Sequence, residues 1–289
     1  MRFKLNRIKP LRTIETSATF LFLSIATVVA LFPVFYTLMA SGKSTMDILA
    51  NPDRIIPERF AFENYTQAWR AADFAQYTLN SVFLAFFIVV GTIITCTIAG
   101  YVFDRGRFRG KDLIFAMVLA SMFISLGSLT LYPVLMIARF FGINRTLWGV
   151  IIIRVLGIDV PCLFIARGYI NTIPREIDEA ARIDGCNFFG IFVKIIFPLI
   201  KPLIATIGIL QFRTAWNDYM MPMIFTMTNR SRMPLVVGVV NLKFSGGETA
   251  ANWGIMLAGT AISIVPMIII FIIFNRYFID NLTAGAVKG

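Results

Sequence analysis

The feature that most constrains this chain is a series of long, continuously apolar runs in a sequence of 289 residues. A run of about 20 apolar residues is long enough to cross the hydrocarbon core of a bilayer as an α-helix. The runs do not alternate with a period of two, so helices are favoured over the strands of a membrane barrel. The sequence therefore predicts an all-α integral membrane protein whose six transmembrane helices cover residues 14–39, 77–103, 113–137, 147–170, 199–225 and 253–274.

Composition argues against the main alternative, which is a large soluble core of buried helices. Apolar residues make up 57% of the chain and the mean hydropathy is +0.76, whereas about half of the residues of a soluble domain are apolar. The chain has no His, and its three Cys lack CxxC spacing. We therefore expect no His-based catalysis, no disulfide framework and no metal site.

Lys and Arg are unevenly distributed among the segments between the runs, and this predicts the orientation. The N-terminal tail, the segments after the second and fourth runs and the C-terminal tail hold 16 of them, while the other, longer segments hold nine. Because Lys and Arg are retained on the cytoplasmic side, both termini and the segment after 147–170 are predicted to be cytoplasmic. The first run is too long for a signal peptide and is expected to be retained. Residues 1–289 are thus predicted to form a single transmembrane domain.

The net charge of +11 raises one other possibility, which is nucleic-acid binding. No basic helix with interleaved aromatic residues is present in the sequence, so we expect no nucleic-acid partner. The charge is instead typical of a protein whose basic residues lie against the cytoplasmic side of a lipid bilayer.

The segment 174–198 is charged and amphipathic, and it lies between two apolar runs. Pro174 suits the first turn of a helix, and three carboxylates follow in that turn, near the positive end of the helix dipole. Gly185 can end this helix in the left-handed conformation, and Asn187 can begin a second one. The pattern predicts a helix–turn–helix on the membrane surface, which an ordinary interfacial amphipathic helix would also fit.

The same segment carries a specific spacing. Glu179, Ala180 and Ala181 are followed by Gly185 three residues later, and then by Ile195 and Pro198. This spacing resembles the cytoplasmic EAA loop of the membrane permeases of bacterial ABC importers. That family has Leu before the final Pro where this chain has Phe197, which is also large and apolar.

Three further segments extend the resemblance over nearly the whole chain. They point to the carbohydrate-uptake subclass, which includes the smaller permease of maltose importers. The segments are Asn80-Ser81 with Gly100-Tyr101 and the basic turn that follows, Ala215-Trp216-Asn217-Asp218 with Pro222, and the tail 282–289.

The resemblance implies the ABC type I importer permease fold, with a cytoplasmic coupling helix, in the bacterial cytoplasmic (inner) membrane. Such a chain is a sugar transporter subunit and not an enzyme, and it has no catalytic residue. The implied partners are a second permease, two cytoplasmic ATPase subunits that hold ATP and Mg²⁺, and an extracellular or periplasmic solute-binding protein. This chain itself needs no cofactor. Its Gly42-Lys43-Ser44 lacks the glycine that a P-loop has five positions earlier, where Thr37 stands.

Two sets of residues are implied to contact the ATPase subunits. Glu179 would sit in a cleft of one ATPase subunit, and Gly285 and Lys288 of the tail would reach between the two. The full set implied for the coupling loop is Glu179, Ala180, Ala181, Asp184 and Gly185.

Polar residues inside the fourth and fifth runs form a candidate substrate path. A charge there costs about 2.5–3.5 kcal/mol on insertion scales, so it should face protein, a partner or water. Aromatic rings could stack on sugars, and amide or carboxylate groups could bind hydroxyls. Structural roles are equally compatible with the sequence. Arg154 and Asp159 could pair internally, and Trp216 and Asn217 could serve in packing or gating. The set is Arg154, Asp159, Trp216, Asn217, Asp218 and Tyr219.

Other classes of protein are less well supported. A secondary transporter would be expected to have internal repeats or an ion-coupling carboxylate, and an intramembrane serine enzyme would want a His base that the chain lacks. Within the ABC class, a permease for polyamines or another non-sugar solute remains an alternative. Arg154 and Arg213 would suggest an acidic sugar only if they were unpaired. The sequence therefore does not identify which sugar is transported.

Overall fold

The computed structural model describes residues 10–71, 73–124, 127–244 and 252–286, and within these ranges the chain forms helices and turns but no strand. The prediction of an all-helical chain is confirmed. The chain divides into two compact units, Met1–Ala68 with Leu242–Ile262 and Trp69–Asn241 with Ser263–Gly289.

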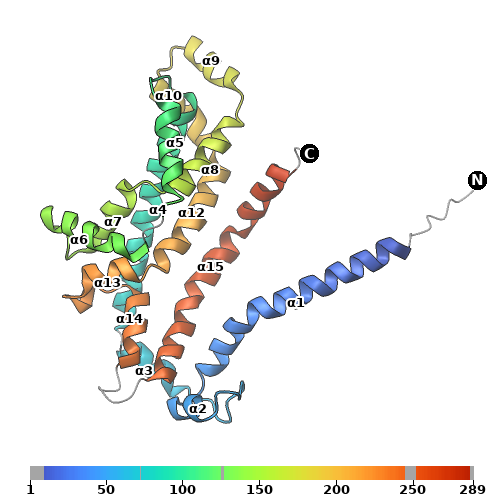
Figure 1. The fold of residues 1–289 in the computed structure, drawn as a ribbon, viewed down its shortest axis with the longest axis vertical. Coiled ribbons are helices and arrows are strands. Elements are labelled where there is room, and N and C mark those ends of the chain that lie inside the picture. The colour runs from blue at the N-terminus through green and yellow to red at the C-terminus, as the bar shows by residue number, and fades with distance from the viewer. Residues whose placement is uncertain (1–9, 72, 125–126, 245–251, 287–289) are drawn as a thin grey trace, which may run out of the picture. The chain divides into compact units, whose positions relative to one another are not determined.

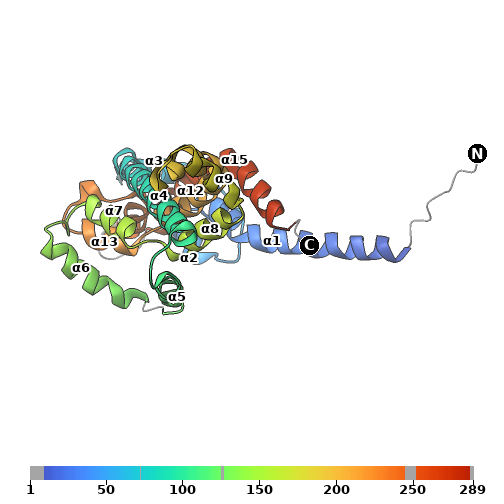
Figure 2. The same ribbon diagram turned by 90° about the horizontal axis from the view of Figure 1, so that it is seen from above.

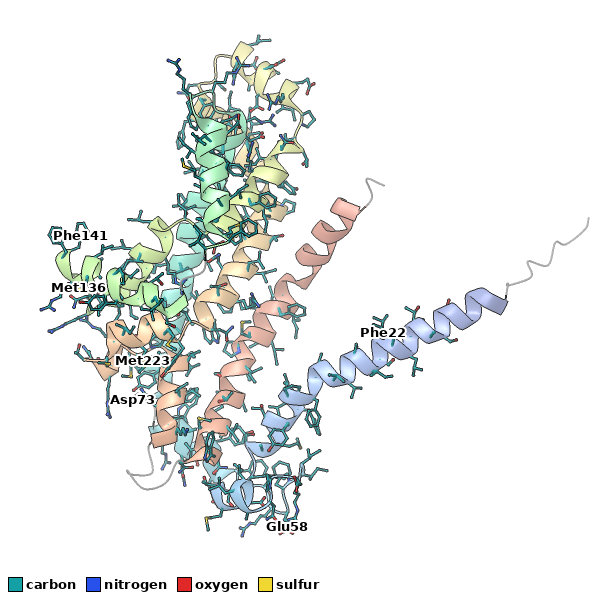
Figure 3. All side chains as sticks on the ribbon, in the orientation of Figure 1. Phe22, Glu58, Asp73, Met136, Phe141 and Met223 are labelled. Atoms are coloured by element: carbon teal, nitrogen blue, oxygen red, sulfur yellow. The ribbon has the colours of Figure 1, made fainter. Side chains whose placement is uncertain are left out.

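Three of the six predicted spans are continuous helices that are long and apolar enough to cross a membrane. They lie within α1 (Pro10–Ala40), α4 (Phe74–Arg105) and α15 (Trp253–Ala286). The most apolar stretch of α1 buries no residue, and its Phe22 projects from the helix without cover (Figure 3). A helix that is apolar on all sides and uncovered by its own chain is suited to lipid or to a partner helix.

The other three predicted spans are interrupted. Residues 113–137 fall on α5 (Lys111–Ser121), the 3₁₀ turn η1 (Gly127–Thr130) and α6 (Leu131–Phe140). Residues 147–170 fall on α7 (Leu147–Leu156) and α8 (Val160–Asn171), which are bent by 45°. Counting each bent helix pair as one span gives up to five candidate spans in the described residues.

The fifth predicted span begins after a sharp bend. The helical stretch Phe188–Leu199 meets α12 (Lys201–Trp216) at 78°, and α13 (Met220–Thr226) follows after a second break. Within Phe188–Leu199 the helix is built from α10 (Phe188–Ile191), the π-helical turn η2 (Phe192–Ile196) and α11 (Phe197–Leu199).

Local chemistry explains the two breaks of this half of the chain. Between α7 and α8, Ile158 has a φ of 42°, and the Asp159 side chain caps α8 by accepting from the Cys162 amide at 2.9 Å. Pro161, which lacks an amide proton, stands in the first turn of α8. Between α12 and α13, Asn217 ends the helix and its side chain donates to the Arg213 carbonyl at 2.9 Å.

The core of the second unit lies where α4, α8 and α12 pack together, as the view along the long axis shows (Figure 2). Gly100 allows α4 and α8 to approach closely. A Cβ there would come within 2.9 Å of the Ala166 Cβ and 3.0 Å of the Arg167 amide. The helix α9 (Arg175–Ile183) and α10 lie at the end of this bundle away from α13 and α14 (Leu235–Asn241) (Figure 1).

The first unit contains α1, α2 (Thr45–Ala50), most of α3 (Glu63–Ala71), the short turn η4 (Leu242–Phe244) and the start of α15. The short turn η3 (Arg230–Arg232) precedes α14 in the second unit. Lys43 is buried here and its ammonium donates to the carbonyls of Asn51 and Arg54. The Asn64 side chain donates to the Ser41 and Lys43 carbonyls. Lys43 therefore holds a turn together, which leaves its ammonium no freedom to bind a phosphate.

Candidate coupling site and membrane cavity

The segment 174–198 forms the two helices that its sequence predicts. Pro174 precedes α9, whose first turn carries Glu176 and Asp178. Gly185 has a φ of 83°, and its amide donates to the Arg182 carbonyl at 3.0 Å. Asn187 caps α10 by accepting from the Gly190 amide at 2.7 Å. The predicted roles of Gly185 and Asn187 at the helix ends are confirmed.

The helix α9 has two unlike faces. Asp178 and Ala181 are its buried residues. Glu179 and Ala180 lie on the opposite, solvent-exposed face, and so does Ile183, whose exposed fraction is 87%. Asp184 and Gly185 are exposed as well. Of the five residues expected in the coupling loop, only Ala181 is buried in the protein, and the other four are exposed.

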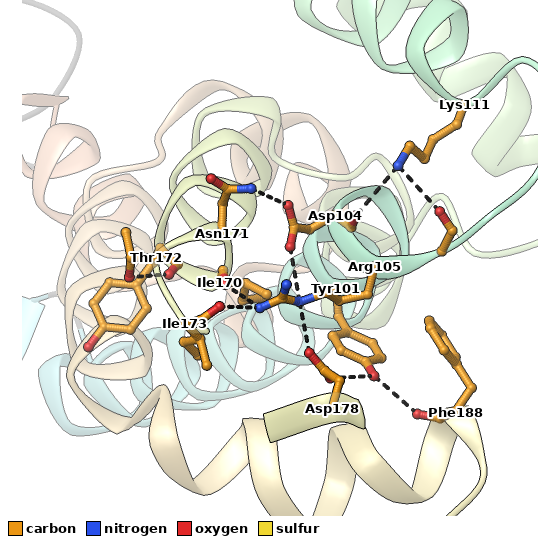
Figure 4. Close-up of polar contacts among 12 residues, drawn as sticks. Tyr101, Asp104, Arg105, Lys111, Ile170, Asn171, Thr172, Ile173, Asp178 and Phe188 are labelled. Atoms are coloured by element: carbon orange, nitrogen blue, oxygen red, sulfur yellow. Dashed lines mark hydrogen bonds and ion pairs between the residues drawn. The ribbon is translucent and has the colours of Figure 1, made fainter. Parts of the chain in front are cut away.

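A buried charge cluster lies beneath α9 (Figure 4). We use this name for Tyr101, Asp104 and Arg105 at the end of α4, Asn171 at the end of α8, and Asp178 on α9. The Arg105 side chain is only 4% exposed, and its Nε lies 3.1 Å from Asp104 Oδ2 and 3.2 Å from Asp178 Oδ2. Its Nη2 donates to the carbonyls of Ile170 and Ile173.

Only part of the cluster has hydrogen-bond partners. Within the described residues, Arg105 Nε and Nη1, Asp104 Oδ2 and Asp178 Oδ2 have none, so Arg105 is joined to the two carboxylates by charge alone. The Asn171 side chain donates to Asp104 Oδ1 at 2.8 Å, and the Tyr101 hydroxyl lies 3.4 Å from Asp178 Oδ1. The Lys111 ammonium donates to the Asp104 and Gly106 carbonyls nearby. Because buried charges are costly unless they are paired and hydrogen-bonded, this arrangement holds its members in one geometry.

The sequence does not predict this cluster. Arg105 falls among the basic residues of a predicted cytoplasmic turn, and Asp178 is predicted only to lie near the positive end of its helix dipole. One signal was present: Asp178 is three residues before Ala181 on α9, so the two lie on the same face of that helix.

A cavity of about 540 Å³ opens among α5, α6, α7, α8, α12 and α13. Both helix breaks contribute to its wall, through residues 157–161 and through Asp218 with Met220 and Met221. The wall also contains uncharged polar residues that the sequence does not predict as part of a substrate path: Ser121, Thr130, Gln211 and Thr214.

Three of the six residues of the candidate substrate path line this cavity: Arg154, Asp159 and Asp218. Arg154 is paired with Asp218, with 3.1 Å between its Nε and Oδ2 and a second bond from Nη2. Asp159 faces the α8 terminus, where it caps the helix. Among the described residues, no group of three or more Cys, Asp or Glu is placed to hold a metal ion.

The other three residues of the path are not part of the cavity wall. Trp216 is buried, stacks on Phe212 with ring centroids 5.4 Å apart, and donates from its indole nitrogen to the Ser263 carbonyl at 3.3 Å. Asn217 is engaged with the Arg213 carbonyl, and Tyr219 is half-buried. Of the predicted tail contacts, Gly285 falls in the last turn of α15 and Lys288 lies outside the described residues.

The fold and the site define a helical membrane protein with a cavity that contains an ion pair and with a charged surface helix, and comparison with known proteins identifies its class. The family described as "binding-protein-dependent transport system inner membrane component" matches residues 105–282. The chain belongs to this family. It is therefore a multi-pass inner-membrane component of a transport system and not an enzyme, as the sequence predicts.

Two relatives are similar over nearly their whole length. The chain is 31% identical to the arabinooligosaccharides transport system permease protein AraQ of Bacillus subtilis, over 98% of this chain and 99% of that one. It is 30% identical to the sulfoquinovosyl glycerol transport system permease protein SmoH of Agrobacterium fabrum, over 97% and 94%. A permease chain in the crystal structure of a bacterial ABC transporter involved in the import of the acidic polysaccharide alginate has a TM-score of 0.75 at 23% identity, covering 96% of this chain and 100% of that one. The fold is thus that of an ABC type I importer permease.

Proposed function

We propose that this chain is the permease subunit of an ATP-driven importer for a sugar or oligosaccharide, and that it forms half of the translocation pathway beside a second, homologous permease. The names of its relatives support the sugar class, since they include permeases for arabinooligosaccharides and galactooligosaccharides. Two cytoplasmic ATPase subunits would hydrolyse ATP, and a solute-binding protein on the outer side would deliver the sugar.

The observation that carries this proposal is that two helix breaks open onto one cavity, whose wall combines apolar residues with polar and charged ones. Irregular backbone at membrane depth is tolerated where it is buried in protein or lines a cavity, and discontinuous helices form the substrate sites of many transporters. The breaks at 157–159 and 217–219 fit this rule. Hydroxyl, amide and charged groups in the wall suit the hydroxyls of a saccharide.

The cavity wall bears on the choice of sugar. Arg154 is already paired with Asp218, and Asp159 adds a second carboxylate to the same wall. An acidic sugar would have to compete with Asp218 for this guanidinium. The charge of the wall in this chain therefore favours a neutral saccharide over an acidic one.

For the coupling function, we place the exposed face of α9 against an ATPase subunit, with Glu179, Ala180, Asp184 and Gly185 in contact and Ala181 packed inward. The exposed Ile183 supports a docking role, because a large apolar side chain on a charged surface helix is more stable when covered. The tail residues Gly285 and Lys288 are proposed to reach between the ATPase subunits.

The topology that we propose keeps a single transmembrane domain over residues 1–289. Six spans cross the membrane with both termini inside, and the interrupted third, fourth and fifth spans each count as one crossing. The distribution of Lys and Arg supports this orientation.

The test is reconstitution of this chain in proteoliposomes with its second permease, ATPase subunits and solute-binding protein. We expect sugars, and not polyamines, to stimulate ATP hydrolysis and uptake, and we expect Glu179→Ala to weaken both while the complex still assembles. Glu176→Ala, which removes an exposed carboxylate one turn earlier on α9, is the matched control and should have the smaller effect. Uptake that needs no ATPase would instead indicate a secondary transporter.

A further inference from the structure

We propose that Arg105 is a positioning residue that ties the coupling helix α9 to the ends of α4 and α8, so that movement of α9 reaches the cavity wall through the buried charge cluster. This inference rests on the proposed function and names the side chains that transmit the movement. It concerns the inward face of α9, opposite the exposed face that is proposed to meet the ATPase.

Arg105 binds three parts of the chain at once. On α9 it contacts the carboxylate of Asp178, at the end of α8 it donates to the Ile170 carbonyl, and in the connection between the two it donates to the Ile173 carbonyl. The residue itself is the last of α4. A guanidinium is planar and presents its donors in a fixed fork, so it fixes directions as well as distances between its partners.

The way α9 is held makes this tie important. Its fully buried residues are Asp178 and Ala181, and Ile177 beside them is half-buried. The next helical stretch is held differently, because Ile191, Phe192 and Ile196 are all buried in the apolar core. The ion pair of Asp178 with Arg105 is therefore the main polar connection between α9 and the rest of its unit in the described residues.

The helix α8 connects the two sites. Its first residues, Val160 and Pro161, line the cavity, and its last residues, Ile170 and Asn171, touch the buried charge cluster. A helix of 12 residues is about 18 Å long. Because α8 packs closely on α4 at Gly100, a displacement at its cluster end is carried as a rigid-body shift to its cavity end.

A stability role alone does not explain this choice of residues. Well-packed apolar side chains hold a static contact as well as a buried ion pair does, and often better. The Arg105 guanidinium attracts two carboxylates by charge, and its Nη2 makes directional hydrogen bonds to the Ile170 and Ile173 carbonyls. This combination is suited to a connection that must transmit both pulling and pushing. We therefore expect that breaking this ion pair lowers the amount of sugar transported per ATP hydrolysed, while the complex still assembles.

The experiment measures sugar uptake and ATP hydrolysis together in proteoliposomes that contain the complete transporter. For Asp178→Asn and Arg105→Lys, we expect sugar transported per ATP hydrolysed to fall about tenfold, within the usual range for coupling between two sites, while hydrolysis continues. Arg107→Gln is the matched control, because this exposed Arg lies two residues away. Its ratio should equal that of the native chain.

Two results would overturn the inference. One is an unchanged ratio in assembled Asp178→Asn transporter, including the case in which uptake and hydrolysis fall in equal proportion, which a purely structural role predicts. If Asp178→Asn does not assemble, Tyr101→Phe removes only the hydroxyl beside Asp178, and an unchanged ratio there would also count against the tie. Failure of the proposed function is distinct, because the native complex would then show no ATP-dependent sugar uptake.

Discussion

The molecule contains two Arg–Asp pairs in unlike settings. Arg105 is 4% exposed and is shared between two carboxylates and two carbonyls at the coupling end of the second unit. At the cavity the Arg154 side chain is 40% exposed and binds one carboxylate, that of Asp218, whose side chain is 8% exposed. The same chemistry thus gives a fixed connection where water is excluded and an exchangeable contact where water has access.

This difference has an energetic basis. Breaking a buried ion pair leaves an uncompensated charge and is strongly destabilising, whereas a partly exposed pair is weakened by solvent and salt. The pair at the cavity can therefore open for a solute at modest cost. The pair beneath α9 cannot, and this suits it to holding a helix in place.

The largest effect is expected from Arg105→Ala. This change leaves Asp104 and Asp178 buried without their cation, and we expect a loss of about 3–5 kcal/mol of stability. The loss would appear as a lower thermal unfolding temperature of the purified complex. Arg107→Ala serves as the control and should leave this temperature unchanged. If Arg105→Ala and Arg107→Ala unfolded at the same temperature, the buried ion pair would contribute little to stability. It would then no longer differ in this respect from the pair at the cavity.

A smaller effect is expected from Gly100→Ala, which tests whether α8 is held against α4 between the two pairs. The new Cβ would come within 2.9 Å of the Ala166 Cβ, and overpacking of this kind costs about 1–3 kcal/mol. Gly168→Ala on α8, the facing helix, is the control, because nothing lies within 4 Å of a Cβ there. Thermal unfolding of the two variants should separate them, and a larger loss for Gly168→Ala would contradict the packing described here.

The smallest effect on stability is expected at the cavity. A double-mutant cycle with Arg154→Gln and Asp218→Asn should give a coupling free energy below about 1 kcal/mol, since Arg154 is partly exposed. Uptake should nonetheless fall in both single variants, because both residues line the cavity. Unfolding and uptake assays measure the two quantities separately. A coupling free energy as large as that between Arg105 and Asp178 would show the pairs to be alike.

Local features of the chain could be predicted from its sequence. The positive φ of Gly185 and the cap at Asn187 follow from the chemistry of single residues, and the continuous apolar runs within α1, α4 and α15 follow from length alone. These features depend on residues that are close together in the sequence.

The long-range features could not be predicted in the same way. Arg105 follows an apolar run and looks like any basic residue at a membrane boundary; its burial depends on Asp178, which is distant in the sequence. The Arg154 partner could not be chosen among several carboxylates, and the structure selects Asp218 over Asp159. Trp216 looks like a sugar-stacking residue, but it is buried and its indole nitrogen donates to the Ser263 carbonyl, which is distant in the sequence.

The most direct test of the difference between the two regions is the ratio of sugar uptake to ATP hydrolysis in assembled, reconstituted Asp178→Asn transporter, measured beside the native complex. We predict that hydrolysis continues while uptake per ATP falls about tenfold. A native ratio in this variant would contradict the role assigned to the buried charge cluster.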